Sequence, residues 1–254
     1  MTFNRIAVVT GASSGIGAAT ALALARARFQ IFLGARREDR LREVADEITS
    51  VGGSATPLPL DITEDASVDV FAASLPEAVH LLINNAGGAK GVERIEAAVD
   101  DKWRWMWEVN VLGTLRMTRA LLPRLRASGD GHIVNVGSIA GFETYAGGAG
   151  YTGAKHAERA LTRTLRLELL GEPIRVTEIS PGLVETEFSL VRFGGDAERA
   201  QAVYRGMEPL TAEDVADCIA WVATRPSRVN IDEIVVRPRD QATATSVHRR
   251  EEPR

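Results

Sequence analysis

Short apolar runs alternate with longer amphipathic segments from one end of the chain to the other. Runs such as IAVV and LLI are apolar at every position, which is typical of strands buried on both faces of a sheet. The segments between them repeat apolar residues at helical spacing. This alternation predicts right-handed β–α–β crossovers, and therefore a doubly wound α/β fold in which a single parallel sheet carries helices on both faces.

The same pattern gives approximate bounds for each element. The predicted sheet is seven-stranded, with strands at residues 5–10, 30–34, 55–60, 79–84, 132–137, 174–180 and 231–236. Helices are predicted at residues 16–28, 38–50, 64–74, 101–127, 150–170 and 211–224.

No linker or internal repeat interrupts the pattern, so we expect a single domain over residues 1–239. Residues 183–210 lie between the sixth strand and the last helix and contain several glycines, and an insertion of this length is expected to cover a site. Residues 240–254 are polar and charged, and their composition predicts a frayed C-terminal tail.

Composition excludes several classes of protein. The chain has 254 residues, 45% of them apolar and 25% charged, which is the balance of a globular fold. A formal charge of −4 argues against a nucleic-acid or anionic membrane partner. We find no apolar stretch of about 18 residues and no leader peptide ahead of the first strand, so neither a membrane span nor secretion is expected. The single cysteine, Cys218, suits a reducing cytoplasm, and the scattered histidines predict no metal site.

A glycine-rich turn follows the first predicted strand and precedes the first helix. It reads Thr10-Gly11-Ala12-Ser13-Ser14-Gly15-Ile16-Gly17. Glycines let the backbone approach a pyrophosphate, and the helix N-terminus offers free N–H groups and the positive end of its dipole. The turn therefore predicts a dinucleotide site formed by Gly11, Ser13, Ser14, Gly15, Ile16 and Gly17.

The turn also satisfies the G-x-S-x-G pattern of a serine hydrolase, with Ser13 as the nucleophile. His156 or His248 would then have to act as the base. This alternative is weaker because a turn after the first strand leaves no earlier loop to supply an oxyanion hole, and because it does not explain Gly17.

The end of the second predicted strand indicates which dinucleotide is bound. An NAD site has a carboxylate there that accepts a hydrogen bond from the ribose 2′-hydroxyl. This chain has Gly34-Ala35-Arg36-Arg37 instead. Two guanidinium groups suit a 2′-phosphate, so Arg36 and Arg37 favour NADP(H). The alternative is a solvated pair that opens the next helix.

Tyr151 and Lys155 open the predicted helix 150–170, and their i, i+4 spacing places both on one helix face. A free phenol is a poor base at neutral pH, and a cation within a few ångström favours its ionised form. Lysine is otherwise found only at Lys90 and Lys102, since the chain uses arginine for its other cations. The pair therefore predicts a general acid–base, with an amphipathic surface pair as the alternative.

Two further polar residues lie where catalysis could use them. Ser138 ends the fifth predicted strand, and the carboxyl ends of parallel strands are where open α/β sheets bind ligands. A serine that simply closes the strand is an equal alternative. Asn110 lies within the predicted helix 101–127, where asparagine is unfavourable unless it has a role.

Taken in order, these motifs resemble those of the short-chain dehydrogenase/reductase family. The resemblance rests on the glycine turn, Asn84-Asn85-Ala86-Gly87, Asn110, Ser138, Tyr151-x-x-x-Lys155 and Pro181-Gly182. Residues 182–189, 191–193, 222–226, 230–231 and 247–249 are also similar to the NADP-dependent 3-hydroxy acid (serine 3-) dehydrogenase branch. The resemblance implies a Rossmann-type fold and an NADP(H)-dependent oxidoreductase that transfers a hydride between nicotinamide and a carbonyl or secondary alcohol.

The resemblance further implies roles for individual residues. Tyr151 would give or take the proton, and Lys155 would favour its phenolate form and hold the nicotinamide ribose. Ser138 would fix the substrate oxygen, and Asn110 would hold a water that connects Lys155 to solvent. The implied cofactor contacts beyond the glycine turn are Arg36, Arg37, Asp61, Ile62, Asn84, Asn85, Ala86, Gly87, Pro181, Gly182, Val184 and Thr186.

Substrate identity stays open at this point. A 3-hydroxy acid or serine-like compound is the first expectation, with Arg192 binding its carboxylate, although a surface arginine on a mobile segment is an equal alternative. Reduction of a neutral ketone or aldehyde and a non-catalytic NADPH sensor are the other candidate functions. Ser14 stands where many NADP-dependent members of the family have a basic residue, and Glu185 stands where the branch usually has glycine. By resemblance, the long helices would pair across subunits of a homo-oligomer, a homotetramer.

Overall fold

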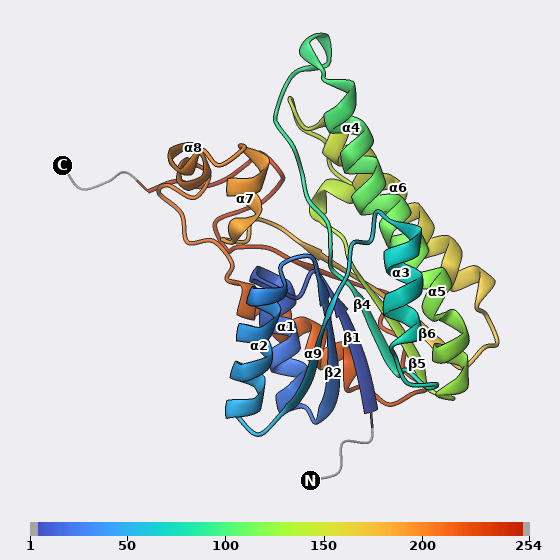
Figure 1. Cartoon of the computed structure of the whole chain (residues 1–254). Helices are drawn as coiled ribbons and strands as arrows, with labels where there is room; N and C mark the ends of the chain where they lie inside the picture. The colour runs from blue at the N-terminus through green and yellow to red at the C-terminus, as the bar shows by residue number, and fades with distance from the viewer. Residues whose placement is uncertain (1–4, 251–254) are drawn as a thin grey trace.

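The computed structural model describes residues 5–250 and shows one sheet between two layers of helices (Figure 1). Its strands are β1 (Arg5–Thr10), β2 (Phe29–Ala35), β3 (Ser54–Pro59), β4 (Leu81–Asn84), β5 (Gly131–Val136), β6 (Ile174–Pro181) and β7 (Glu233–Val236). Their order is β3-β2-β1-β4-β5-β6-β7, and every neighbouring pair is parallel. The predicted Rossmann-type fold with a seven-stranded sheet is confirmed.

Each face of the sheet is covered by its own set of helices (Figure 1). One face carries α1 (Gly15–Arg26), α2 (Glu38–Ser50) and α9 (Ala212–Ala223), and the other carries α3 (Asp65–Ala73), α5 (Gly113–Ala127) and α6 (Ala149–Glu168). Residues of β1 alternate between the two cores: Ala7 and Val9 pack in the first and Val8 in the second. This explains why the strand is apolar at every position.

The strand order changes direction between β1 and β4. The chain moves outward from β1 to β3 and then returns to β4 on the other side of β1. Loops that leave the carboxyl ends of β1 and β4 therefore diverge, and a crevice opens between them. The glycine turn after β1 and the NNAG segment after β4 both lie at this opening.

The predicted helix 101–127 is not a regular helix. Helix α4 (Asp100–Trp107) passes through a π-helical turn, η2 (Glu108–Leu112), into α5. The Nδ2 of Asn110 donates to the carbonyls of Met106 (2.7 Å) and Gly88 (2.8 Å), and its Oδ1 accepts from the N–H of Gly88 (3.1 Å). The expectation of one uniform helix is corrected here: the widened turn lets Asn110 bind the segment after β4.

Residues 183–210, the covering segment, contain two short helices, α7 (Glu187–Arg192) and α8 (Ala197–Ala202). The chain after β7 packs against this segment. Gln241 is 5% exposed and accepts a hydrogen bond from the N–H of Leu183 (2.8 Å), while the N–H of Arg250 donates to the carbonyl of Gly206 (2.7 Å). Residues 240–250 are therefore folded rather than frayed, and residues 251–254 lie outside the described residues.

Two short 3-10 helices complete the secondary structure, η1 (Ile95–Ala97) and η3 (Ile139–Gly141). None of the helices within residues 5–250 has the length and apolar character needed to cross a membrane. Over the same range, no cluster of three histidine, cysteine or acidic residues could hold a metal ion.

Candidate active site

A cavity of about 740 Å³ lies at the carboxyl ends of the strands. Its lining includes most of the residues predicted for the site: Gly11, Ser13, Ser14, Gly15, Ile16, Arg36, Arg37, Asp61, Ile62, Asn85, Ala86, Gly87, Ser138, Tyr151, Lys155, Pro181, Gly182, Val184, Thr186 and Arg192. The other predicted residues, Gly17, Asn84 and Asn110, lie behind the cavity wall among the described residues, where they support those that form it.

The glycine turn has no room for side chains. A Cβ on Gly17 would lie 2.3 Å from the carbonyl oxygen of Gly11, and a Cβ on Gly11, whose φ is +66°, would lie 2.9 Å from the Cα of Ala86. The side chain of Asn85 donates to the carbonyl of Thr10 (2.9 Å), so it fastens the turn to the end of β4. Glycine at these two positions therefore lets the turn fold tightly against the end of β4, and Gly11 and Gly15 bring bare backbone to the cavity wall, where a pyrophosphate could approach it.

Arg37 is anchored at the end of the cavity near α1. Its guanidinium donates to the hydroxyls of Ser13 (3.1 Å) and Ser14 (2.7 Å), and it pairs with Glu187 of α7 (2.8 Å). The hydrogen bond from Arg37 lowers the pKa of the Glu187 carboxyl. The departure at Ser14 thus contributes a hydroxyl to the same cluster, which fixes the arginine at the cavity wall.

Asp61, which follows β3, brings a hydrogen-bonded carboxylate to the cavity wall. The hydroxyl and the N–H of Thr63 both donate to Asp61, at 2.7 and 3.0 Å. Partial burial would raise the pKa of the Asp61 carboxyl, but the two hydrogen bonds and the nearby Arg36 outweigh burial and lower that pKa. Arg36 itself is largely exposed and lies 4.0 Å from Asp61, so it is less fixed than Arg37.

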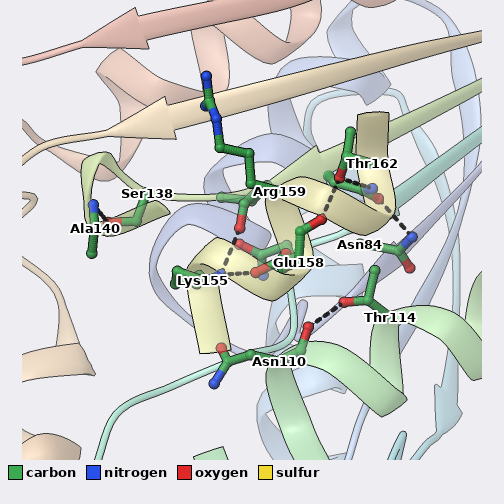
Figure 2. A network of polar contacts seen from close by, with 12 residues as sticks. Asn84, Asn110, Thr114, Ser138, Ala140, Lys155, Glu158, Arg159 and Thr162 are labelled. Carbon is green, nitrogen blue, oxygen red and sulfur yellow. Dashed lines mark hydrogen bonds and ion pairs between the residues drawn. The ribbon is translucent and has the colours of Figure 1, made fainter. Parts of the chain in front are cut away.

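A buried polar chain connects the sheet to α6. Asn84 donates to the hydroxyl of Thr118 (3.0 Å) and to Oδ1 of Asn135 (2.9 Å), and Asn135 donates to the hydroxyl of Thr162 (2.8 Å). Figure 2 shows Asn84 and Thr162 at one end of this network and Lys155 at the other. Asn84 therefore fixes the position of α6 over β4 and β5 instead of reaching into the cavity.

The first turns of α6 carry the predicted acid–base pair. Tyr151 is 8% exposed and Lys155 is 6% exposed, and both line the cavity. The Nζ of Lys155 donates to the carbonyl of Val136 (3.0 Å). A Cβ on Gly87 would lie 3.8 Å from this Nζ and 2.7 Å from Oδ1 of Asn110, so the lysine, the segment after β4 and the π-helical turn meet at one point.

Ser138 lies opposite this pair, immediately after β5. Its hydroxyl oxygen accepts a hydrogen bond from the N–H of Ala140 (3.1 Å) and caps the short helix η3. Because the oxygen is the acceptor, its proton is left to donate to an oxygen atom in the cavity.

Arg192 brings the covering segment to the part of the cavity that Tyr151 lines. Its Nε donates to the carbonyl of Gly91 (3.2 Å) and its Nη2 to the hydroxyl of Tyr145 (2.9 Å). Its guanidinium carbon lies 5.7 Å from the ring centroid of Tyr151, and the ring of Phe188 lies 5.5 Å from the same ring. Burial raises the pKa of Tyr145 despite the adjacent arginine, so this phenol stays a hydrogen-bonding group at neutral pH.

Sequence reasoning did not find four residues of this site: Glu158, Glu187, Tyr145 and Phe188. Glu158 is an ion-pair partner of Lys155, one turn further along the inward face of α6. A signal for it was present, because an acidic residue occupies an inward position of an amphipathic helix. The others come into the site through tertiary contacts of the covering segment, which no local pattern reveals.

The model of the short chain dehydrogenase family matches residues 5–192. The chain belongs to this family. An uncharacterized oxidoreductase of Mycobacterium tuberculosis is 61% identical over 244 residues, covering 96% of this chain and 95% of that protein. An NADP-dependent 3-hydroxy acid dehydrogenase of Schizosaccharomyces pombe is 44% identical over 254 residues, with 98% of each chain covered. The closed form of a serine dehydrogenase complexed with NADP+ has a TM-score of 0.90 at 39% identity, covering 97% of this chain and 100% of that one.

These matches confirm the family predicted from the motifs, and they confirm that this short-chain dehydrogenase is an oxidoreductase. The serine hydrolase alternative is wrong. The hydroxyl of Ser13 accepts a hydrogen bond from Arg37, and no histidine lines the cavity within residues 5–250. The Glu185 side chain is exposed and outside the cavity lining, although its charge is one of the influences that raise the pKa of Tyr204 in that lining, after burial.

Proposed function

We propose that this short-chain dehydrogenase is an NADP(H)-dependent oxidoreductase that interconverts a carbonyl and a secondary alcohol. The observation that carries the proposal is the arrangement of the cavity. Arg37 and the glycine turn form one end, and Ser138, Tyr151 and Lys155 form the other. A dinucleotide extended between these ends would bring its nicotinamide to the tyrosine.

The residues present fit this cofactor. The turn offers bare backbone, β2 ends in arginines without a carboxylate, and two serine hydroxyls support Arg37. When bound, NADP(H) supplies or accepts the hydride, which is chemistry that no side chain can perform. The residues expected to hold the cofactor are those of the glycine turn with Arg36, Arg37, Asp61, Ile62, Ala86, Gly87, Pro181, Gly182, Val184 and Thr186.

The chain's own contribution is alignment and a proton. Ser138 donates a hydrogen bond to the substrate oxygen and holds it within reach of Tyr151. Tyr151 gives its proton to that oxygen during reduction, or takes one from it during oxidation. Lys155, held by the carbonyl of Val136, favours the phenolate form of Tyr151 through its positive charge. Phe188 and Arg192 cover the tyrosine ring and exclude water.

We further propose that the substrate is an acid, in the first instance a 3-hydroxy acid or its 3-oxo counterpart. Arg192 lies over Tyr151 with Nε and Nη2 bonded, and among the described residues its Nη1 has no hydrogen-bond partner. A carboxylate a few bonds from the reacting carbon could accept from this nitrogen. The 3-hydroxy acid and serine dehydrogenases similar to this chain support the same substrate class.

A substrate screen with 3-hydroxy acids, 3-oxo acids and neutral ketones, each with both nicotinamide cofactors, tests the proposal. Tyr151→Phe should abolish turnover and keep NADPH binding, which separates an enzyme from a sensor. A protein that binds NADPH and turns over none of these compounds would refute the oxidoreductase assignment.

Arg192→Ala tests the acid clamp. The loss of a charge-assisted hydrogen bond, about 1.5–3 kcal/mol, should raise KM for an acid roughly ten- to 150-fold and leave KM for a neutral ketone nearly unchanged. Arg199→Ala, on the exposed side of α8, is the matched control. Equal effects of Arg192→Ala on both substrates would remove the clamp and leave a neutral ketone or aldehyde as the substrate.

We also propose, from the family resemblance, that the protein is a homotetramer located in the cytoplasm. The outer faces of α4 and α5 expose Trp103, Trp107 and Leu115, and apolar faces of this kind suit helix pairing in a homotetramer. A monomer in light scattering would contradict it. The single free thiol, Cys218, suits the reducing cytoplasm, which fractionation of cells would test.

A further inference from the structure

Helix α6 places a buried carboxylate against the lysine of the acid–base pair. The Oε2 of Glu158 lies 2.6 Å from the Nζ of Lys155, and the two residues are 3% and 6% exposed. Figure 2 shows the Lys155 side chain joined to Glu158. The ammonium also donates to the carbonyl of Val136 in β5 (3.0 Å). The carboxylate lies on the side of Lys155 away from the cavity, since Glu158 is not among the residues that line it in the described structure.

Packing alone does not account for an acid at this position. The other inward residues of α6 include Ala154, Thr162 and Leu165, which are small, neutral or apolar. Removing a carboxylate from water costs several kcal/mol, and an apolar side chain of similar length is often as stable or more stable in such a place. Lys155 also has the carbonyl of Val136 as a partner without Glu158. A role in the chemistry of Lys155 is therefore the better explanation.

A second acid lies near the pair and acts on both of its members, but it is bound to other partners. The second acid nearby, Glu178 of β6, accepts from Arg159 (3.0 Å) and from the hydroxyl of Ser180 (2.8 Å). Arg159 also pairs with Glu233 of β7. Lys155 is thus the cation that pairs with Glu158 within the described residues, while Tyr151 and Glu178 are the other titratable groups that act on the lysine. The Tyr151 ring itself is faced by Arg192 and Tyr145, which Glu158 does not contact.

The two ionisable groups affect each other strongly. Burial is the largest influence on the pKa of Lys155 and would lower it, but the charge of Glu158 and the nearby phenol outweigh burial and raise that pKa. Burial raises the pKa of the Glu158 carboxyl, and the ammonium offsets this only in part. Both shifts agree with the geometry of a tightly coupled pair.

We propose that Glu158 is a positioning residue that holds the Lys155 ammonium and offsets its charge, so that Tyr151 ionises at higher pH than Lys155 alone would allow. This inference rests on the proposed roles of Tyr151 and Lys155. Its consequence is that the phenol keeps its proton, and so serves as the donor for carbonyl reduction, up to a higher pH. Oxidation, which needs the phenolate, is fast only in more alkaline solution.

Glu158→Gln tests the proposal because it keeps the shape of the side chain and removes its charge. The pH profile of kcat/KM for alcohol oxidation should move to lower pH by about one unit or more. Glu168→Gln, an exposed charge removal on the same helix, is the matched control and should superimpose on the parent profile. A Glu158→Gln profile that is lower at all pH values but not displaced would indicate a structural role and overturn the proposal.

A spectroscopic titration gives the same test without any substrate. The chain has three tyrosines, so the ultraviolet absorbance of tyrosinate in the parent, minus that in Tyr151→Phe, reports the ionisation of Tyr151 alone. The same difference in the Glu158→Gln background should have its midpoint at lower pH, and an unmoved midpoint would overturn the proposal. Failure to find a carbonyl substrate would count against the proposed function only, since this titration needs none.

Stability of the variant is monitored by NADPH binding and thermal unfolding. Should Glu158→Gln lose both, Glu158→Met keeps the length of the side chain in a fully apolar form and must show the same displacement. Glu158→Asp keeps the negative charge, so it should displace the midpoint of the Tyr151 titration less than Glu158→Gln or Glu158→Met does. An Asp variant displaced as far as the Gln or Met variant would contradict a role based on charge.

Discussion

Replacing Arg37 by serine tests whether the charge at the end of β2 selects NADP(H). The guanidinium is half exposed at the cavity wall and is already positioned by Ser13 and Ser14. A hydrogen bond from a guanidinium to a phosphate contributes about 1.5–3 kcal/mol. Arg37→Ser should therefore raise the Kd of NADPH by roughly ten- to 150-fold. The Kd of NADH, which has no 2′-phosphate, should be nearly unchanged.

Fluorescence titration of both reduced cofactors measures the effect, and equal loss of affinity for NADH and NADPH would refute the reasoning. Two further variants give opposite or smaller changes. Glu187→Gln should strengthen NADPH binding. In the parent protein the Arg37 guanidinium pairs with the Glu187 carboxylate at 2.8 Å, and it must weaken that ion pair before it can bind a phosphate. Arg36→Ser should have the smaller effect, because Arg36 is more exposed than Arg37 and lies 4.0 Å from its nearest acid, Asp61.

Two other predictions concern stability. Gly17→Ala should lower Tm and weaken NADPH binding, because the new Cβ would lie 2.3 Å from the Gly11 carbonyl oxygen. Gly153→Ala places its Cβ within α6 where nothing lies within 4 Å, so it should raise the free energy of unfolding by about 0.5–1 kcal/mol. A higher Tm for Gly17→Ala than for Gly153→Ala would contradict the packing described. Burial and nearby arginines hold the pKa of His132 well below its ordinary value, so near neutral and mildly acidic pH the imidazole binds a proton only in the unfolded chain. As the pH falls below about 6.5, the free energy of unfolding should therefore decrease by roughly 1.4 kcal/mol per pH unit. His132→Gln should remove that part of the pH dependence in denaturant titrations, and identical slopes in both proteins would contradict it.

Features set by local chemistry could be predicted from the sequence. The bounds of β1 and α2 match those expected, because a fully apolar run and an amphipathic run with acidic residues in its first turn are signals contained within each segment. The glycine turn and the Tyr151–Lys155 spacing are equally local. For these, the structure adds distances to an arrangement that was already expected.

Features set by contacts between distant segments could not be predicted in this way. The π-helical turn at Asn110 accompanies the hydrogen bonds of its side chain with Gly88, which lies in the loop after β4. The partner of Arg37 lies in α7, far along the sequence. The polar composition of residues 240–250 gave no sign that Gln241 is buried against the covering segment. Each of these depends on which surfaces the completed sheet brings together.

The covering segment leaves and rejoins the domain at a single place. The N–H of Glu185 donates to the carbonyl of Leu210 (2.9 Å), the N–H of Leu210 donates to the carbonyl of Leu183 (3.0 Å), and Val184 and Leu210 form a parallel bridge. The chain between these residues therefore forms a loop with a closed base next to the end of β6 and the start of α9. From within this loop Glu187 pairs with Arg37 and Arg192 binds Gly91 and Tyr145, so a change in its sequence would alter both ends of the cavity at once.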